Sequence, residues 1–516
     1  MNTKNTLFLA KRAFLTIGFL LLTTMGANAQ TVFGFQNHSG DHLWSNAENW
    51  TDGQKPTGET AVVKVYADVI IDENVDIMQL EGETACDLTV QSGKKLTVRE
   101  SISWSSDGSI VFEDKAQLVY NQSISATVMK RIPAYDAGTH LWNIIASPIV
   151  ENIVPTIENG FLTEPETGYA LFAYYEADHS MIDFKEEPFS IANGAGYLYA
   201  NALDTTLLFS GNVRGCLTPA EVSLSYHSNN GQLSGCNFVG NPLPCNAYPS
   251  KSYYVLNEGS NSLIAVALSS GTPITPCSGI IVKAEGTGDV VAFSHEAPSF
   301  NERHGYLEIT AAKSNAPTLV LDQALLSFNE GDNLGKFSLY KNAPMVYFTK
   351  NSKNLAILSV DSVDVQTLKF DAAENGNYTL HFELKDLHPE YLHLIDNMTG
   401  DNRDLLANPN YTFSATTTDY ASRFKLVFDP HYGVGEYEDG PLTGSGTFAY
   451  YANGEIVIND VETQDFASLQ IIDMTGRVIV RRDGAHTVST TGIAPGVYVL
   501  RLSTTHGVRT QKMVIQ

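Results

Sequence analysis

Short apolar runs separated by Gly, Asp and Ser recur along the first third of the chain. Residues 61–65, 69–71, 88–90, 95–98, 109–112 and 117–120 are runs of this kind. Several alternate apolar and polar side chains with a period of two, which predicts β-strands with one buried face. Because the runs follow one another at short, loosely regular intervals, they are typical of stacked coils that each add a strand to the last. We expect a solenoid-like region or an irregular β-sandwich over residues 30–135.

Residues 136–300 contain one pattern written twice. Each copy has a strand closed by Pro, a long excursion, a strand opened by Gly and a short strand ending in Phe-Ser. The copies comprise residues 141–148, 196–201 and 207–211, and then residues 237–242, 279–284 and 290–294. Pro ends a strand because it has no N–H to donate, and Gly permits unusual dihedrals where the chain re-enters. Two similar β-halves predict a single sandwich.

The remaining chain continues in strands. Residues 301–430 have the pattern of an antiparallel sandwich, with turn chemistry at Asp396-Asn-Met-Thr-Gly400. Residues 431–446 are rich in Gly and acids and poor in apolar residues, which predicts a linker. A compact series of strands follows over residues 447–516. The predicted fold class is therefore all-β, a multidomain chain of sandwich and solenoid-like units.

Composition narrows the possible partners. The chain has 516 residues, with 32 Lys and Arg against 57 Asp and Glu, for a formal net charge of −25. An acidic surface repels a phosphate backbone, so nucleic-acid binding is excluded. The expected sites contain no catalytic, cofactor-binding or metal-ligating residue, because the chain has no nucleophile elbow, phosphate loop, dinucleotide fingerprint or helical zinc motif.

The first residues form a leader. Lys4, Lys11 and Arg12 precede an apolar run over residues 13–22. A segment of small residues follows and ends at Ala29. This order predicts a signal peptide over residues 1–29, cleaved between Ala29 and Gln30 after recognition by the Sec translocase. The apolar run is shorter than the roughly 20 residues that a spanning helix needs, and we expect no transmembrane helix in the mature chain.

Five cysteines, an odd number, enter an oxidising compartment, so at least one should remain free. Cys245 follows the Pro of the second copy, and Cys277 precedes its Gly. If the two strands are neighbours, these residues come within bridging range, and we predict a possible disulfide between Cys245 and Cys277.

Three blocks near the end of the chain carry a resemblance. They are residues 469–478, which include Gly476, residues 492–502, which include Gly492, Pro495, Gly496 and Tyr498, and residues 512–516, which open with Lys512. In order and distance from the end, they resemble the type A C-terminal sorting domain of type IX secretion cargo in Bacteroidota. The resemblance covers the last domain alone, so it does not identify the family of the passenger.

The resemblance implies an immunoglobulin-like sandwich over residues 447–516 and two-stage export. After the periplasm, a type IX translocon would recognise the folded tail. A sortase would then remove it, leaving the body anchored on the cell surface or released.

The sequence evidence for ligand sites in the passenger is weaker than the evidence for the sorting domain. Trp44 and Trp50 could stack on sugar rings, but aromatic residues at this position are more typical of a core cap. We expect a non-enzymatic adhesin or a module that binds a glycan or a host protein. Two alternatives remain open: a secreted hydrolase with an unrecognised pair of carboxylates, and a structural component of a surface layer.

Overall fold

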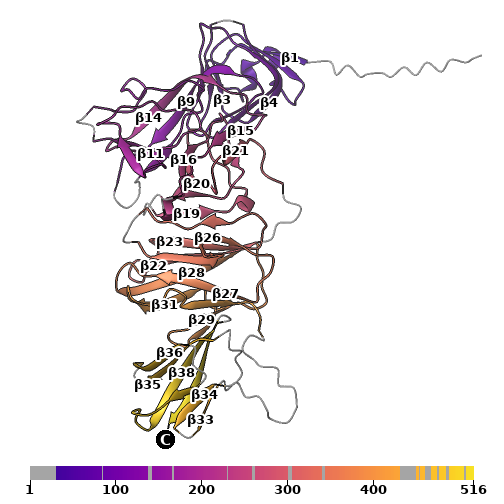
Figure 1. Ribbon diagram of the computed structural model, residues 1–516. Coiled ribbons are helices and arrows are strands. Elements are labelled where there is room, and N and C mark those ends of the chain that lie inside the picture. Colours follow the sequence, from indigo (N-terminus) through magenta and orange to yellow (C-terminus); the bar gives the residue numbers. More distant parts are fainter. Residues whose placement is uncertain are drawn as a thin grey trace, which may run out of the picture. The chain divides into compact units, whose positions relative to one another are not determined.

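The computed structural model describes most of the chain after residue 30, namely residues 31–83, 85–136, 142–164, 168–228, 231–257, 262–299, 305–339, 343–430, 449–452, 454–458, 466–473, 476–483, 487–504 and 507–515. The predicted leader, with its cleavage site at Ala29 and Gln30, and the predicted linker lie outside these residues. The chain divides into two compact units, residues 1–432 and 433–516. The regular secondary structure of the described residues is almost all strand in both units, as Figure 1 shows, and the all-β prediction is confirmed.

Parallel strands open the first unit and form two sheets. One sheet has the order β1-β2-β4-β6-β8 and the other has the order β14-β9-β7-β5-β3. The strands of the first are β1 (Thr31–Phe35), β2 (Ala61–Val65), β4 (Val75–Gly82), β6 (Lys95–Ser103) and β8 (Gln117–Val119). Those of the second are β3 (Val69–Ile71), β5 (Leu88–Val90), β7 (Ile110–Phe112), β9 (Ile124–Ile132) and β14 (Thr205–Val213).

The two sheets arise because successive coils stack in register. In the second sheet Val69 pairs with Leu88, and Leu88 pairs with Ile110, so each coil extends the sheet by one parallel strand. The alternate apolar residues of these strands are buried in one continuous core. β14 then pairs antiparallel with β9 and closes that edge of the sheet.

Two four-stranded sheets follow, and they have the same strand order. In each sheet the first strand pairs with the fourth, the fourth pairs with the second, and the second pairs with the third. The first sheet contains β10 (Asn143–Ile145), β11 (Ala170–Tyr175), β12 (Ser180–Asp183) and β13 (Tyr197–Ala200). The second contains β16 (Cys236–Gly240), β18 (Tyr253–Leu256), β19 (Leu263–Val266) and β20 (Gly279–Lys283).

A small sheet and short turns complete this region. The sheet has the order β15-β21-β17, with β15 (Ala220–Ser223), β17 (Tyr248–Pro249) and β21 (Val290–Ser294). The 3-10 turns in the described part of the unit are η1 (Ala47–Asn49), η2 (Thr51–Gly53), η4 (Gly231–Leu233) and η5 (Leu268–Ser270). Among the residues that the structure describes, no helix has the length and apolar character needed to cross a bilayer.

An eleven-stranded sheet ends the first unit. Its order is β30-β29-β32-β27-β25-β26-β23-β22-β28-β31, with β24 paired to β26. Strands from both ends of this order bury side chains in one cluster, so the sheet folds over a shared core. The strands are β22 (Tyr306–Lys313), β23 (Asp322–Ser327), β24 (Leu334–Gly335), β25 (Met345–Lys350), β26 (Lys353–Ser359), β27 (Val365–Asp371), β28 (Gly376–Lys385), β29 (His393–Asp396), β30 (Asn402–Asp404), β31 (Asn410–Ala415) and β32 (Phe424–Val427).

The predicted boundaries inside the first unit do not coincide with breaks in packing. The β9–β14 pairing joins residues on either side of residue 135 in one sheet. A second core cluster joins Ile144, Ile281 and Ile357 across residue 300. The structure thus places the three predicted passenger domains in one compact unit.

The second unit has two sheets around its own core. One has the order β33-β34-β37 and the other has the order β36-β35-β38-β39. The first comprises β33 (Ala449–Ala452), β34 (Glu455–Ile458) and β37 (Thr487–Ser489). The second comprises β35 (Phe466–Asp473), β36 (Val478–Asp483), β38 (Gly496–Thr504) and β39 (Gly507–Ile515). Apolar residues of both sheets form a single buried cluster, as expected of a β-sandwich.

Candidate functional sites

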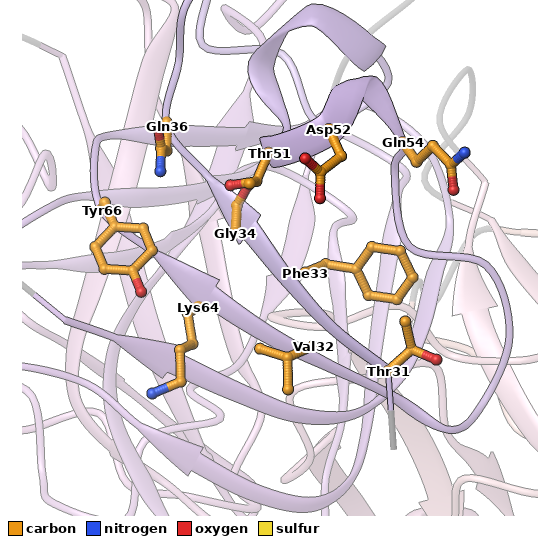
Figure 2. A pocket seen from close by; sticks show the side chains of 10 residues that line it. All are labelled: Thr31, Val32, Phe33, Gly34, Gln36, Thr51, Asp52, Gln54, Lys64 and Tyr66. Carbon is orange, nitrogen blue, oxygen red and sulfur yellow. The ribbon is translucent and has the colours of Figure 1, made fainter. Parts of the chain in front are cut away.

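A hollow of about 380 Å³ opens over the first strand of the solenoid-like region. Its described lining is mostly polar and comes from β1, from η2 and the residue after it, and from the end of β2. Figure 2 shows Tyr66 and Lys64 on one side of β1, Phe33 and Gln54 on the other, and Thr51 and Asp52 above it. The full lining is Thr31, Val32, Phe33, Gly34, Gln36, Thr51, Asp52, Gln54, Lys64 and Tyr66.

Local backbone geometry shapes this hollow. Gly34 has no side chain, and a Cβ there would lie 2.6 Å from Thr51 Oγ1 and 3.4 Å from the Tyr66 ring. The Thr51 hydroxyl can therefore approach and donate to the Gly34 carbonyl at 3.2 Å. Asp52 adopts a left-handed backbone with φ of 64°, a conformation that Asp tolerates better than most residues. Its carboxyl group and the ring of Tyr66, which is 44% exposed, both belong to the lining.

The lining contains a single carboxyl group among the described residues, that of Asp52. Lys64 forms ion pairs with Glu81 at 3.0 Å and with Glu83 at 2.5 Å, which balance its charge. The hollow therefore presents amides, hydroxyls, one carboxylate and an aromatic ring, which suit a polar, uncharged ligand better than an ion.

The two tryptophans considered as sugar platforms lie in the core. Trp44 and Trp50 are each 1% exposed and meet edge to face, with ring centroids 4.6 Å apart. The Trp50 indole N–H donates to the Trp44 carbonyl at 2.8 Å, which satisfies its polar atom inside the core. The preferred interpretation, a core cap, describes both side chains.

A buried carboxylate near the second four-stranded sheet resembles part of an acid–base site. Glu176 lies directly after β11, and its Oε2 is 2.6 Å from Nδ1 of His227. The same carboxylate accepts from the backbone N–H groups of His227 and Gly235 and from the Ser225 hydroxyl. Burial works to raise the pKa of Glu176, but these hydrogen bonds outweigh it and lower that pKa to about 2. Glu176 therefore serves mainly to hold the backbone between β15 and β16.

All five cysteines are buried, and Cys245 and Cys277 belong to different cores. Cys277 packs with the solenoid-like region, and its carbonyl accepts from Ala146 N–H at 3.2 Å. Cys245 instead shares a core with Cys216, and the two thiols are in hydrogen-bond contact. This contact lowers the pKa of Cys216 against the opposing effect of burial. The neighbour of Cys245 is thus a cysteine from another segment.

The three C-terminal blocks singled out in the sequence meet in one sheet of the second unit. Asp473, in the first block, pairs with Tyr498, in the second. Val499 pairs with Lys512, which opens the third block. Blocks separated along the chain therefore occupy the neighbouring strands β35, β38 and β39.

The individual residues of these blocks have distinct places. Gly476 and Gly492 lie in turns with φ of 88°, which favours Gly strongly. Pro495 directly precedes β38, and Gly496 is its first residue. The Tyr498 ring is buried, and its hydroxyl donates to the Ala494 carbonyl at 2.8 Å, which fixes the entry into β38. Lys512 is exposed on β39.

Comparison with protein families decides the role of this unit. Residues 452–516 match the secretion system C-terminal sorting domain. The chain is cargo of the type IX secretion system. This cargo is exported to the cell surface or the extracellular space, and the secretion machinery is its partner.

The cargo's passenger matches a second family model. Residues 36–265 match a domain of unknown function (DUF8693), which spans most of the solenoid-like region and continues into the second predicted copy, as far as β19. No curated protein matches the chain.

Sequence reasoning missed the residues of the first hollow. Gln36, Asp52 and Tyr66 lie in or beside turns, and no periodic pattern marks them. A weak signal was present: Tyr66 directly follows a strand, at a position where an exposed aromatic side chain has no core to fill.

Proposed function

We propose that the passenger of this cargo is a non-enzymatic binding protein that recognises a glycan through the hollow over β1. The observation that carries the proposal is the lining of that hollow, where an exposed Tyr ring stands beside amide, hydroxyl and carboxylate groups. Sugars present a C–H face that packs on aromatic rings and a set of hydroxyl groups that pair with amides and carboxylates. The described side chains offer both kinds of contact.

The same lining supports binding over hydrolysis. Glycoside hydrolysis usually needs two carboxyl groups about 5 to 9 Å apart. Asp52 is the single acid among the described residues that line the hollow, so it can accept hydrogen bonds from a sugar but lacks a second carboxyl group beside it. Two alternatives remain: the passenger could be a hydrolase with its active site elsewhere, or a structural component of a surface layer. In either case this hollow would have no role in binding a ligand.

The test is binding of the purified chain to a glycan array, followed by titration of the best glycan. Replacing Tyr66 with Ala removes the ring, and we expect affinity to fall about tenfold, in line with the contribution of an aromatic contact. Replacing Asp52 with Ala should also weaken binding, because it removes hydrogen-bond acceptors.

Tyr135 supplies the matched control. It is 46% exposed, close to the value for Tyr66, and it is not part of the hollow's described lining. The Tyr135→Ala variant should bind as the unmodified chain does. An array without any bound glycan, or equal losses in the Tyr66 and Tyr135 variants, would overturn the proposal.

A further inference from the structure

A second hollow, of about 690 Å³, lies in the first unit between the second four-stranded sheet and the eleven-stranded sheet. Four lysines are among its described lining residues, although the chain as a whole carries a formal charge of −25. They come from four separate segments and are Lys251, Lys283, Lys336 and Lys353. Convergence of cations in an acidic protein concentrates positive potential locally.

Two of the four lysines form ion pairs within the walls of the hollow. Lys251 pairs with Asp289 at 3.0 Å. Lys336 is buried and pairs with Asp322 at 2.7 Å, and it also donates to the Gln323 carbonyl. Lys283 and Lys353 also belong to the described lining of the hollow.

Lys353 is placed by a tight turn. Asn351 and Ser352 both have left-handed backbones, with φ of 51° and 62°, and they form the two-residue loop between β25 and β26. Such loops, with two positive φ angles, match the twist of antiparallel strands and fix their register. Lys353 is thus held at the first position of β26, on the rim of the hollow.

Lys283 approaches from the opposite sheet. It ends β20, and its Nζ lies 5.4 Å from the centroid of the Phe337 ring. Burial is the main cause that lowers the pKa of Lys283; Cys236 and Glu176 act to raise that pKa, and the positive charge of Lys353 adds a smaller lowering effect. An anion bound in the hollow would favour the charged form of Lys283 and offset the cost of its burial.

A hydroxyl group adds a second, independent observation. Ser234 lines the hollow, and its Oγ is buried without a hydrogen-bond partner among the described residues. Buried polar atoms are rarely left unpaired, and an orphan beside a hollow marks a position where a ligand or a solvent molecule completes the bonding. Glu285 is the single acid in the described lining, so most of the charge that faces the hollow is positive.

The walls are already rigid. The Tyr254 hydroxyl donates to the Gly335 carbonyl at 2.7 Å, and the Ser252 hydroxyl donates to the Asp332 carbonyl at 3.0 Å, so both sheets are tied at the edge of the hollow. Behind these bonds, apolar residues of both sheets share one core. A preformed site loses less conformational entropy when a ligand binds.

We propose that this hollow binds an oxyanion, a carboxylate or phosphate group, between the ammonium groups of Lys283 and Lys353, with the Ser234 hydroxyl as a further donor. The site is separate from the hollow over β1 and does not depend on glycan binding there. It would let the displayed protein hold an acidic small molecule, or the acidic group of a larger one, despite its net negative charge.

The experiment is calorimetric titration of the full chain at low ionic strength with three probes. Inorganic phosphate and galacturonate separate the two sources of an oxyanion, and galactose serves as the uncharged counterpart of galacturonate. We expect saturable binding of at least one anion and none of galactose at this site. Added sodium chloride should weaken the binding, because it screens the lysine charges.

Substitutions locate the site. Lys353→Gln changes an exposed side chain next to a turn, so it should leave the fold intact and reduce anion affinity roughly tenfold, as expected for loss of a charge-assisted hydrogen bond. Lys283→Gln and Ser234→Ala should also weaken binding. The matched control is Lys115→Gln, an exposed lysine outside the described lining. Failure of both anions to saturate, or equal affinity in the Lys353 and Lys115 variants, would overturn the proposal.

Discussion

At the scale of single residues, the cysteines show how position along the chain can mislead. Cys245 and Cys277 lie close to the ends of neighbouring strands, which favours a link between them, but their side chains enter different cores. Cys216 lies outside the pattern that suggests this pairing, and its segment lies beside the end of β8, where Cys216 N–H donates to the Tyr120 carbonyl. Whether two thiols meet depends on which core each side chain enters. The alternation of apolar and polar residues shows that a side chain is buried but not in which core.

The thiol contact leads to a prediction for oxidising conditions. When the chain folds with oxidised glutathione, Cys216 and Cys245 should form a disulfide; the two thiols lose two protons and two electrons, and glutathione disulfide is reduced. The link would close a loop of about 30 residues and stabilise the fold by roughly 3 kcal/mol. Peptide mapping without reductant checks this outcome. The Cys277→Ser variant should give the same map, whereas a peptide that joins Cys245 to Cys277 would contradict it.

At the scale of elements, a buried ion pair stabilises the antiparallel part of the first unit. Arg423, next to β32, forms two bonds with the Asp396 carboxylate, at 2.9 and 2.6 Å, and donates to the Ser414 carbonyl. The Tyr411 hydroxyl also donates to Asp396 at 2.9 Å. The pair therefore ties the ends of β29, β31 and β32 together, and the guanidinium lies over the Phe413 ring.

Replacing Arg423 with Met should destabilise the first unit by about 3 to 5 kcal/mol, because it leaves the Asp396 carboxylate buried without its partner. Burial acts to raise the pKa of Asp396, but the bonds from Arg423, Met398 and Tyr411 outweigh it and lower that pKa below its usual 3.8. The pair's stabilisation is thus complete above about pH 4 and is lost as the pH falls through the lower, folded-state pKa. Chemical denaturation at neutral and acidic pH measures both effects. An unchanged unfolding midpoint in the variant at pH 7 would contradict the assignment.

Strands were the most predictable elements, because their evidence is local. The alternation in residues 61–65, 69–71 and 88–90 predicted β2, β3 and β5 within the observed bounds. Pairing across long distances was not predictable: β14 joins the sheet of β9, and the strand pattern of each is compatible with several partners. The second hollow was missed for the same reason, since Lys283 and Lys353 come from different sheets and no spacing in the sequence relates them.

At the scale of the whole molecule, the boundary between the two units separates two tasks. The second unit has its own buried core, which includes Ile456, Ile471 and Leu500. It also carries the match to the sorting domain. We therefore expect the export signal to be a folded surface, so that substitutions at its turn residues, such as Gly476 and Gly492, should also reduce export.

Deleting residues 447–516 should leave the protein in the periplasm, because the translocon loses the domain it recognises. Cell fractionation and surface labelling check this result. The Lys353→Gln variant is a suitable control, since it alters the passenger and leaves the sorting domain intact, and it should reach the surface normally. Surface display of the truncated chain at normal levels would refute the prediction.

The coil-by-coil pairing of the solenoid-like region has a consequence for biogenesis. A chain that emerges with its N-terminus first can complete each parallel coil as soon as the next strand appears, since Val69 needs only Leu88, and Leu88 needs only Ile110. β9 differs, because its remaining partner, β14, pairs Ser210 with Thr127. Until that distant segment arrives, β9 is a bare sheet edge, and unpaired edges recruit other chains. The β9 edge is therefore exposed only between the formation of β9 and the arrival of β14. A periplasmic chaperone would be needed most during this interval.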